Sequence, residues 1–344
     1  MKESFTSWKE YQLLLEKEAA KSGLSSNGIL ELLNYAKPIF DSNLPVIYDI
    51  QHLAYLTGYR ITYIKRVLNN ASGFYRNFNI KKRNGKLRNI SEPLPGLKNI
   101  QYWISENIIR KCEQNNLNNA YTIGKSIKTN AKYHTKQDVV LNIDIENYFQ
   151  SINLNTISNF FNKIGYTTIV ANTLSALCIL DNGLPQGAQT SPSLSNLVTT
   201  ELDLQLFKYC REINCRYSRY SDDITISGNF NISLAIENVR AILESFGFKI
   251  NKNKITIKRQ HQRQMVTGLV VNQRIGIKKV ELKKLRLEIY FIKTKGLREH
   301  LLWTKNHKHR YLNHLLGKIQ FFLFIRPDNM EVLGYKNFVL ELFD

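Results

Sequence analysis

Two short runs of alternating apolar and polar residues flank a pair of adjacent aspartates in the second half of the chain. Residues 215–219 alternate into residues 220–223 (Tyr-Ser-Asp-Asp), and residues 224–228 alternate away from them. This alternation predicts a β-hairpin with Asp222 and Asp223 at its tip. Adjacent carboxylates repel each other, so such a tip is most stable when a divalent cation binds between them and a further acid. Taken alone, the pair is more often an ordinary solvated turn.

A third acid is expected from an apolar strand earlier in the chain. Residues 139–143 (Val-Val-Leu-Asn-Ile) lead into Asp144, which predicts a buried strand that carries a carboxylate to its carboxyl end. Carboxylates favour Mg²⁺, and two such ions about 3.5–4 Å apart stabilise both the attacking and the leaving oxygen of a phosphoryl displacement. Asp144 and the pair at 222–223 therefore form a candidate two-metal site for nucleotide polymerisation.

A turn-rich segment lies between these acids in the sequence. Residues 184–192 contain two prolines and Gly187, and a helical pattern then continues through Leu194, Leu197 and Leu202. The glycine is expected to allow a close approach between the backbone and a ligand.

In this order, Asp144, the Pro-Gln-Gly segment at 185–187 and the Tyr-x-Asp-Asp turn at 220–223 resemble the palm motifs of the reverse transcriptase family. The resemblance implies an RNA-directed DNA polymerase, a nucleotidyltransferase. It also implies an α+β right-hand fold with fingers, a palm made of an antiparallel sheet plus helices, and a helical thumb. The implied divisions are an N-terminal helical extension (1–48), fingers (49–138), a palm with the catalytic acids (139–272) and an RNA-binding thumb (273–344).

The local patterns agree with these divisions. Helical spacing predicts helices within residues 7–70, with breaks at Pro38 and Pro45, and again over residues 280–344. Residues 74–92 predict a basic β-hairpin with its turn at Asn84-Gly85, followed by a helix from about 97 to 113.

The resemblance also assigns nucleotide contacts. Lys82 and Arg88 match the lysine and arginine that meet the triphosphate of the incoming nucleotide, and an arginine can bind phosphate in a bidentate way. Phe149 matches the bulky residue that excludes a ribose 2′-OH, and Gln186 and Gly187 complete the nucleotide-binding set. The alternatives are a solvated basic hairpin and ordinary core packing of the phenylalanine.

The metal ligands that the resemblance implies are Asp144, Ile145, Asp222 and Asp223, which would hold two Mg²⁺ ions. The implied catalytic residues are the three aspartates and Lys254. The lysine resembles the family's general acid, which protonates the leaving pyrophosphate.

Two further segments resemble the retron branch of the family. Residues 130–134 (Asn-Ala-Lys-Tyr-His) fit its Asn-Ala-x-x-His signature, and residues 266–268 (Val-Thr-Gly) fit its Val-Thr-Gly triplet. Membership implies binding of a structured noncoding RNA, priming from a guanosine 2′-OH, and synthesis from dNTPs of branched RNA-linked single-stranded DNA (msDNA). It further implies template trimming by host ribonuclease H, and antiphage defence together with a separate effector protein.

Charge points to the same class of partner. The chain carries 48 Lys+Arg against 28 Asp+Glu, a net charge of +20, and residues 249–318 supply +16 of it. A polyanion is the natural partner of such a stretch, and a solvated basic face is the alternative. The RNA-binding positions predicted from the signatures and the basic thumb are Asn130, His134, Val266, Thr267, Gly268, Lys283, Lys284, Arg286, Lys293 and Arg298.

Other classes are disfavoured by the sequence. No apolar run approaches the roughly 20 residues that cross a bilayer, and the first ten residues show no secretory pattern, so no membrane partner and a cytoplasmic location are expected. Two alternatives stay open beside the retron hypothesis. One is another bacterial reverse transcriptase, associated with an intron or with defence, and the other is a nucleoprotein scaffold that restrains an effector.

Overall fold

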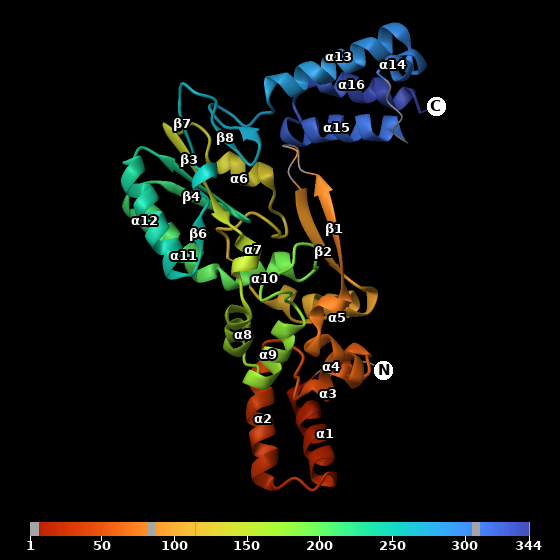
Figure 1. Ribbon diagram of the computed structural model, residues 1–344, viewed down its shortest axis with the longest axis vertical. Helices are drawn as coiled ribbons and strands as arrows, with labels where there is room; N and C mark the ends of the chain where they lie inside the picture. Colours follow the sequence, from red (N-terminus) through yellow and green to blue (C-terminus); the bar gives the residue numbers. More distant parts are fainter. Residues whose placement is uncertain (1–6, 82–84, 86, 114, 305–309, 344) are drawn as a thin grey trace. The chain divides into compact units, whose positions relative to one another are not determined.

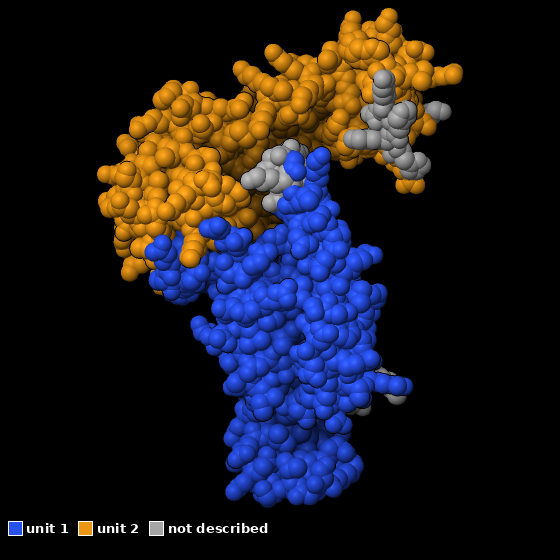
Figure 2. Space-filling view, viewed as in Figure 1, with its two compact units in different colours: residues 1–116, 146–203, 243–248 blue, residues 117–145, 204–242, 249–344 orange. Residues whose placement is uncertain are grey.

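The computed structural model describes residues 7–81, 85, 87–113, 115–304 and 310–343, which fold into two compact units. Figure 1 labels most of the helices and strands, and Figure 2 colours the units. Unit 1 contains residues 1–116, 146–203 and 243–248, and unit 2 contains residues 117–145, 204–242 and 249–344. Because the chain passes between the units several times, they do not follow the contiguous fingers, palm and thumb divisions, which stay predictions.

Unit 1 begins with four helices, which confirms the prediction for residues 7–70. Three of them start at a side chain that accepts a backbone N–H, namely Ser7, Ser25 and Asp49. The helices are α1 (Trp8–Lys21), α2 (Ser26–Asp41), α3 (Ile50–Thr57) and α4 (Ile61–Asn69).

Pro45 lies between α2 and α3 as expected, but the predicted break at Pro38 is wrong, because Pro38 lies inside α2. The proline removes one backbone donor from the helix. Its neighbours Ala36 and Ile39 are fully buried, and their packing outweighs that loss. The helix ends three residues later, at Asp41, and the hydroxyl of the next residue, Ser42, donates to the Pro38 carbonyl at 2.8 Å.

The basic hairpin is confirmed. β1 (Tyr75–Lys81) and β2 (Leu87–Pro93) pair antiparallel, with Lys81 opposite Leu87. Its turn falls within residues 82–86, of which only Gly85 is among the described residues. The following helix, α5 (Pro95–Asn107), begins and ends earlier than expected. Proline is well suited to the first helical position, and the chain continues past α5 as a 3₁₀ turn, η2 (Ile109–Lys111).

The other described elements of unit 1 are helices. The single helix expected through Leu202 is instead two helices, since α10 ends at Val198 and α11 begins at Thr200. Between them, the Thr199 hydroxyl donates to the Ser195 carbonyl at 2.6 Å. The elements are α7 (Tyr148–Ser151), α8 (Leu154–Lys163), α9 (Thr168–Ala176), α10 (Ser191–Val198) and the start of α11 (Thr200–Glu212).

Unit 2 is built on a sheet with the strand order β4-β5-β3-β6, and β7 also pairs with β3. The central strand β3 (Val139–Glu146) is mostly buried, and it pairs antiparallel with both β5 and β7. The other strands are β4 (Arg216–Tyr220), β5 (Asp223–Gly228), β6 (Lys249–Ile250) and β7 (Thr256–Arg259). The predicted hairpin of residues 215–228 is therefore confirmed as β4 and β5.

Smaller elements of unit 2 accompany the sheet. A short helix, α6 (Ile127–Tyr133), contacts the small antiparallel hairpin of β8 (Met265–Val266) and β9 (Leu269–Val270). The remaining elements before the C-terminal helices are α12 (Ile232–Ser245) and a 3₁₀ turn, η3 (Lys252–Lys254).

The C-terminal part of unit 2 is helical, as predicted for residues 280–344. Its core includes Leu285, Ile289, Leu315 and Ile319. The helices are α13 (Lys279–Lys295), α14 (Leu297–Trp303), α15 (Tyr311–Ile325) and α16 (Met330–Glu341). Helices together with antiparallel strands confirm the α+β class. Among the described helices, none is both long and apolar enough to cross a membrane.

Candidate active site

Strand register brings the three predicted acids of unit 2 together. Asp144 on β3 lies opposite Asp223, the first residue of β5, and Asp223 also lies opposite Tyr220 at the end of β4. Asp222 belongs to the two-residue turn between β4 and β5. Each of the three aspartates offers a carboxylate oxygen, and these oxygens lie within 4.8 Å of one another.

Several hydrogen bonds hold the turn. Ser221 is nearly buried and adopts a left-handed conformation, with φ +61°. Its carbonyl accepts from Nη1 of Arg219 at 2.8 Å, and its hydroxyl accepts from the Tyr121 hydroxyl at 3.3 Å. The Ile145 N–H donates to the Asp222 carbonyl at 2.9 Å. The tip is thus tied at its backbone, and its two carboxylates lie beside that of Asp144.

The electrostatics of the cluster favour a bound cation. Desolvation, followed by the charges of Asp222 and Asp144, raises the pKa of Asp223 to about 7. Nζ of Lys254, which lies on η3, is 2.6 Å from Oδ2 of Asp144. Burial lowers the pKa of Lys254, but its hydrogen bond to Asp144 and the charges of the three aspartates together raise it. A hard divalent cation would relieve the repulsion among the carboxylates, so this donor set fits Mg²⁺ or a similar ion.

The predicted ligand Ile145 adjoins this cluster. Its side chain is buried, so only its backbone carbonyl could contribute to a metal. The neighbouring Asp144 carbonyl accepts from the Asn251 N–H at 2.9 Å, which joins β3 to the segment that carries Lys254.

The predicted nucleotide contacts lie in unit 1. Arg88 is exposed on β2, whereas Lys82 lies outside the described residues. Phe149 is half-buried on α7, and its carbonyl accepts from the Leu184 N–H at 2.9 Å. The structure therefore links the segment at 185–187 to the helix that carries Phe149, and nucleotide binding by these residues stays a prediction.

The structure gives one steric reason for glycine at position 187. A Cβ at this position would lie 2.7 Å from the Ser91 carbonyl oxygen and 2.9 Å from Cγ2 of Ile90, and the glycine has φ +132°. The Ser91 N–H also donates to the Gln186 carbonyl at 2.8 Å. The backbone of β2 thus makes one close approach that requires glycine at this position.

Replacing Gly187 by alanine is expected to destabilise the protein by about 2–3 kcal/mol, because overpacking and an unfavourable φ act together. β2 would have to move away from the segment at 185–187, so DNA synthesis should fall as well. Thermal unfolding and primer extension measure the two effects. Gly247→Ala is the matched control, since Gly247 has φ +79° but no atoms within 4 Å of its added Cβ. Equal unfolding temperatures for the two variants would contradict the steric explanation.

The predicted thumb contacts lie on the C-terminal helices. Lys283, Lys284, Arg286, Lys293 and Arg298 are all exposed. Arg286 is held by Glu331 through two hydrogen bonds of 2.6 and 2.7 Å, which leaves it less available to phosphate than the others. RNA binding by these side chains stays a prediction.

The two signature segments contact each other in unit 2. The predicted RNA-binding residues Asn130 and His134 are fully buried at α6, and Val266 is buried in β8. Thr267, with φ +46°, and Gly268, with φ +84°, form the turn between β8 and β9. The Thr267 hydroxyl donates to the carbonyl of Ile127, the first residue of α6, at 3.1 Å. A contact between RNA and the buried side chains would require them to be uncovered, whereas Gly268 is exposed.

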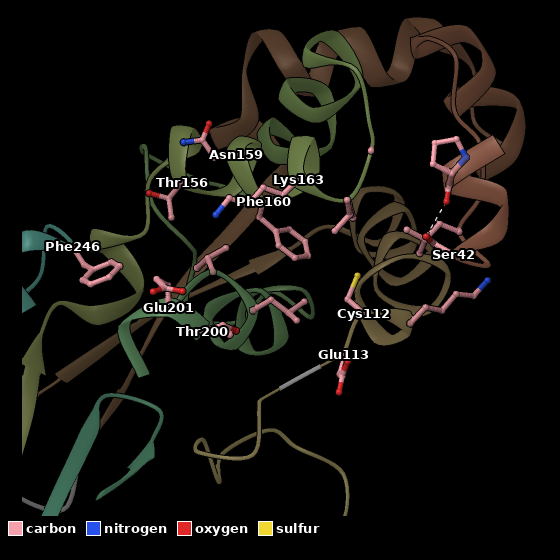
Figure 3. A pocket seen from close by; sticks show the side chains of 17 residues that line it. Ser42, Cys112, Glu113, Thr156, Asn159, Phe160, Lys163, Thr200, Glu201 and Phe246 are labelled. Carbon is pink, nitrogen blue, oxygen red and sulfur yellow. Dashed lines mark hydrogen bonds between the residues drawn. The ribbon is translucent and has the colours of Figure 1, made fainter. Parts of the chain in front are cut away.

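A pocket of about 830 Å³ lies elsewhere in unit 1 (Figure 3). Its lining mixes the apolar side chain of Phe160 with the opposite charges of Lys163 and Glu201. None of the residues predicted to bind metal, nucleotide or RNA lines this pocket. It therefore adds nothing to the candidate site.

Sequence reasoning missed several residues that support the acidic turn, namely Tyr121, Arg219 and the serines at 218 and 227. A signal for two of them was present. Ser218 and Ser227 are polar residues at buried positions of the two predicted strands, and such residues require a hydrogen-bond partner.

The comparisons with known proteins point to one family. The family described as "Reverse transcriptase (RNA-dependent DNA polymerase)" matches residues 80–336. The retron Ec86 reverse transcriptase of Escherichia coli is 30% identical over 254 residues, which are 72% of this chain and 79% of that protein. The retron Mx162 reverse transcriptase of Myxococcus xanthus is 29% identical over 228 residues, or 58% of this chain, and the match spans only 47% of that relative.

Among solved structures, a Candida albicans telomerase in complex with a fragment of telomeric RNA matches with a TM-score of 0.47 and 12% identity. The match covers 77% of this chain and 63% of the telomerase chain. The family match and the retron relatives, which share about 30% identity, show that this chain belongs to the retron-type reverse transcriptases, a family of RNA-directed DNA polymerases.

Proposed function

We propose that this chain is the polymerase of a retron, which binds a structured noncoding RNA and copies part of it into branched msDNA. The observation that carries the proposal is the cluster of Asp144, Asp222 and Asp223, whose oxygens lie within 4.8 Å of one another. These residues, with the Ile145 carbonyl, would hold two Mg²⁺ ions. Bound there, the ions would stabilise the attacking and leaving oxygens of the phosphoryl transfer.

Lys254 is proposed as the general acid for the leaving pyrophosphate. Its ammonium group is 2.6 Å from Asp144, and the surrounding carboxylates keep it protonated. A proton donor beside the metal ligands is well placed to neutralise charge that develops on a leaving oxygen.

Nucleotide binding is proposed for unit 1 residues. Arg88 and Lys82 would contact the triphosphate of a dNTP, since guanidinium and ammonium groups both pair with phosphate. Phe149, supported by its link to Leu184, would exclude a ribose 2′-OH, and Gln186 and Gly187 would border the same nucleotide. The hydrogen bond from Ser91 to Gln186 supports this grouping, because it ties β2 to the Pro-Gln-Gly segment.

The RNA partner is proposed from charge and family. Exposed basic side chains on α13 and α14 suit the shape-based and 2′-OH contacts by which structured RNA is bound. Priming from a guanosine 2′-OH would join the DNA to the RNA, and host ribonuclease H would trim the template. We further propose a cytoplasmic role in antiphage defence together with a separate effector protein.

The nucleic acid that co-purifies with the protein tests this function. The chain would be expressed together with the RNA encoded beside it, and the bound nucleic acid would be extracted and digested with ribonuclease. Single-stranded DNA that keeps a ribonucleotide branch, and that shifts in size after treatment with a 2′,5′-debranching enzyme, is the expected result. Linear DNA with no attached RNA would indicate another type of bacterial reverse transcriptase.

A further inference from the structure

A buried polar network lies at the base of the hairpin that carries Asp222 and Asp223. His134, the residue that follows α6, is 2.7 Å from the Ser218 hydroxyl through Nε2 and 2.7 Å from the Ser227 hydroxyl through Nδ1. The Ser218 hydroxyl donates to Oδ1 of Asn130 at 2.5 Å. We call these four residues the α6 clamp. At most 2% of any of them is exposed.

The donor and acceptor roles in the α6 clamp have a single consistent assignment. Because Ser218 donates its only hydroxyl proton to Asn130, it must accept from Nε2–H of His134. Nδ1 is then unprotonated and accepts from the Ser227 hydroxyl. Burial, with a smaller contribution from the charge of Arg216, lowers the pKa of His134 to about 3. The imidazole is therefore neutral under the conditions of DNA synthesis, as an unprotonated Nδ1 requires.

The clamp holds both strands of the catalytic hairpin. Ser218 lies on β4, two residues before Tyr220, and Ser227 lies on β5. In the register of these strands Ser227 is opposite Arg216, so the two serines point to the same face of the sheet. One imidazole bridges them, and this bridge restricts sliding or opening of β4 against β5.

The helix that carries the clamp is itself fixed. Ser126 and Thr129 form a capping box at its N-terminus. The Thr267 hydroxyl donates to the Ile127 carbonyl, and Nζ of Lys128 donates to the Phe324 carbonyl at 2.8 Å. α6 is thus a fixed support for the hairpin.

We infer that Asn130 and His134 are positioning residues of the active site, which fix both strands of the catalytic hairpin and thereby hold Asp222 and Asp223 beside Asp144. This inference rests on the proposed metal-binding role of the three aspartates. It assigns the Asn-Ala-x-x-His signature to the geometry of the metal site and not to contact with RNA.

The test removes the serines and leaves the signature intact. In the Ser218→Ala/Ser227→Ala variant, Asn130 and His134 are unchanged, so a role in RNA contact would not be affected. Residues that orient metal ligands commonly change metal affinity by 10-fold or more, so we expect this variant and His134→Gln to bind Mn²⁺ about tenfold more weakly in calorimetry without RNA. The Mg²⁺ concentration for half-maximal DNA synthesis should rise in parallel, while the affinity for the noncoding RNA should not change.

The matched control is Ser158→Ala/Ser175→Ala, which removes two buried serine hydroxyls from α8 and α9 of unit 1. This control should bind Mn²⁺ as the unmodified protein does. If the double serine variant of the clamp is unfolded at the assay temperature, the single Ser218→Ala variant carries the same test.

Normal Mn²⁺ affinity in the folded serine variant would overturn the inference. So would a loss of RNA affinity in His134→Gln with unchanged metal binding, which would restore the RNA-contact role. A protein that makes only unbranched DNA would refute the proposed retron function and leave this result standing, because Mn²⁺ binding is measured without any nucleic acid.

Discussion

Replacing Asp222 by asparagine is expected to lower DNA synthesis by roughly a thousandfold or more, which corresponds to a loss of about 4 kcal/mol of transition-state stabilisation. The substitution keeps the size of the side chain but removes one of three charges from the cluster with Asp144 and Asp223. Carboxylates are the ligands that hold catalytic Mg²⁺, so the metals would be lost or misplaced. Asp223→Asn should have the same effect.

RNA binding should survive both substitutions, because the exposed basic residues of α13 and α14 are untouched. Primer extension measures the loss of DNA synthesis, and filter binding of the noncoding RNA measures the RNA affinity. Asp181→Asn is the matched control, since Asp181 is an exposed turn residue and the change of charge is identical. A yield of DNA from Asp222→Asn equal to that of the control would refute the assignment of the active site.

The elements that bring the acids together could be predicted from sequence. The alternation predicted the two strands β4 and β5, and a hairpin with a two-residue turn leaves little freedom in register. The apolar run before Asp144 predicted the partner strand β3, which is largely buried. The local pattern of apolar residues was sufficient to predict these strands, because the formation of each strand depends on residues that are close in sequence.

Other features could not be predicted, because they depend on residues distant in sequence. The packing partner of Gly187 is Ser91, almost a hundred residues earlier, so the glycine pattern showed a close approach but not what approaches. Pro38 is accommodated inside α2 by tertiary packing, which overrides local helix propensity. The two buried serines of β4 and β5 are hydrogen-bonded to His134, and hydrophobic periodicity does not predict which residue is their partner.

The retron signatures show the same limit. Their positions along the chain pointed to the family, and the resemblance led to the prediction that Asn130 and His134 bind RNA. In the structure they are buried, while the turn residue Gly268 of the other signature is exposed. Of the two signature segments, the one with Asn130 and His134 therefore has buried side chains, whereas the turn of the other is accessible to a partner at Gly268.

Arg219→Met is expected to disrupt the catalytic turn, with a loss of about 2–3 kcal/mol in stability and a fall in DNA synthesis of on the order of a hundredfold. Arg219 is fully buried, and its Nη1 donates to the Ser221 carbonyl at 2.8 Å. Its backbone also pairs with residues 117 and 119, so the strand itself should persist when the side chain is shortened. Methionine fills similar space but leaves the Ser221 carbonyl without this donor, and a buried acceptor without a partner is costly.

Thermal unfolding and primer extension, compared with Arg211→Met, separate this effect from a general loss of charge. Arg211 is exposed on α11 and stacks over Phe207, so its replacement should change neither the unfolding temperature nor the DNA synthesis greatly. Arg219→Lys keeps the charge but not the planar group that reaches the carbonyl, and it should recover only part of the activity. Full activity in Arg219→Met would mean that the left-handed Ser221 and the Ile145–Asp222 hydrogen bond hold the turn without the arginine. In that case the buried guanidinium would serve the stability of unit 2 and not the geometry of the metal site.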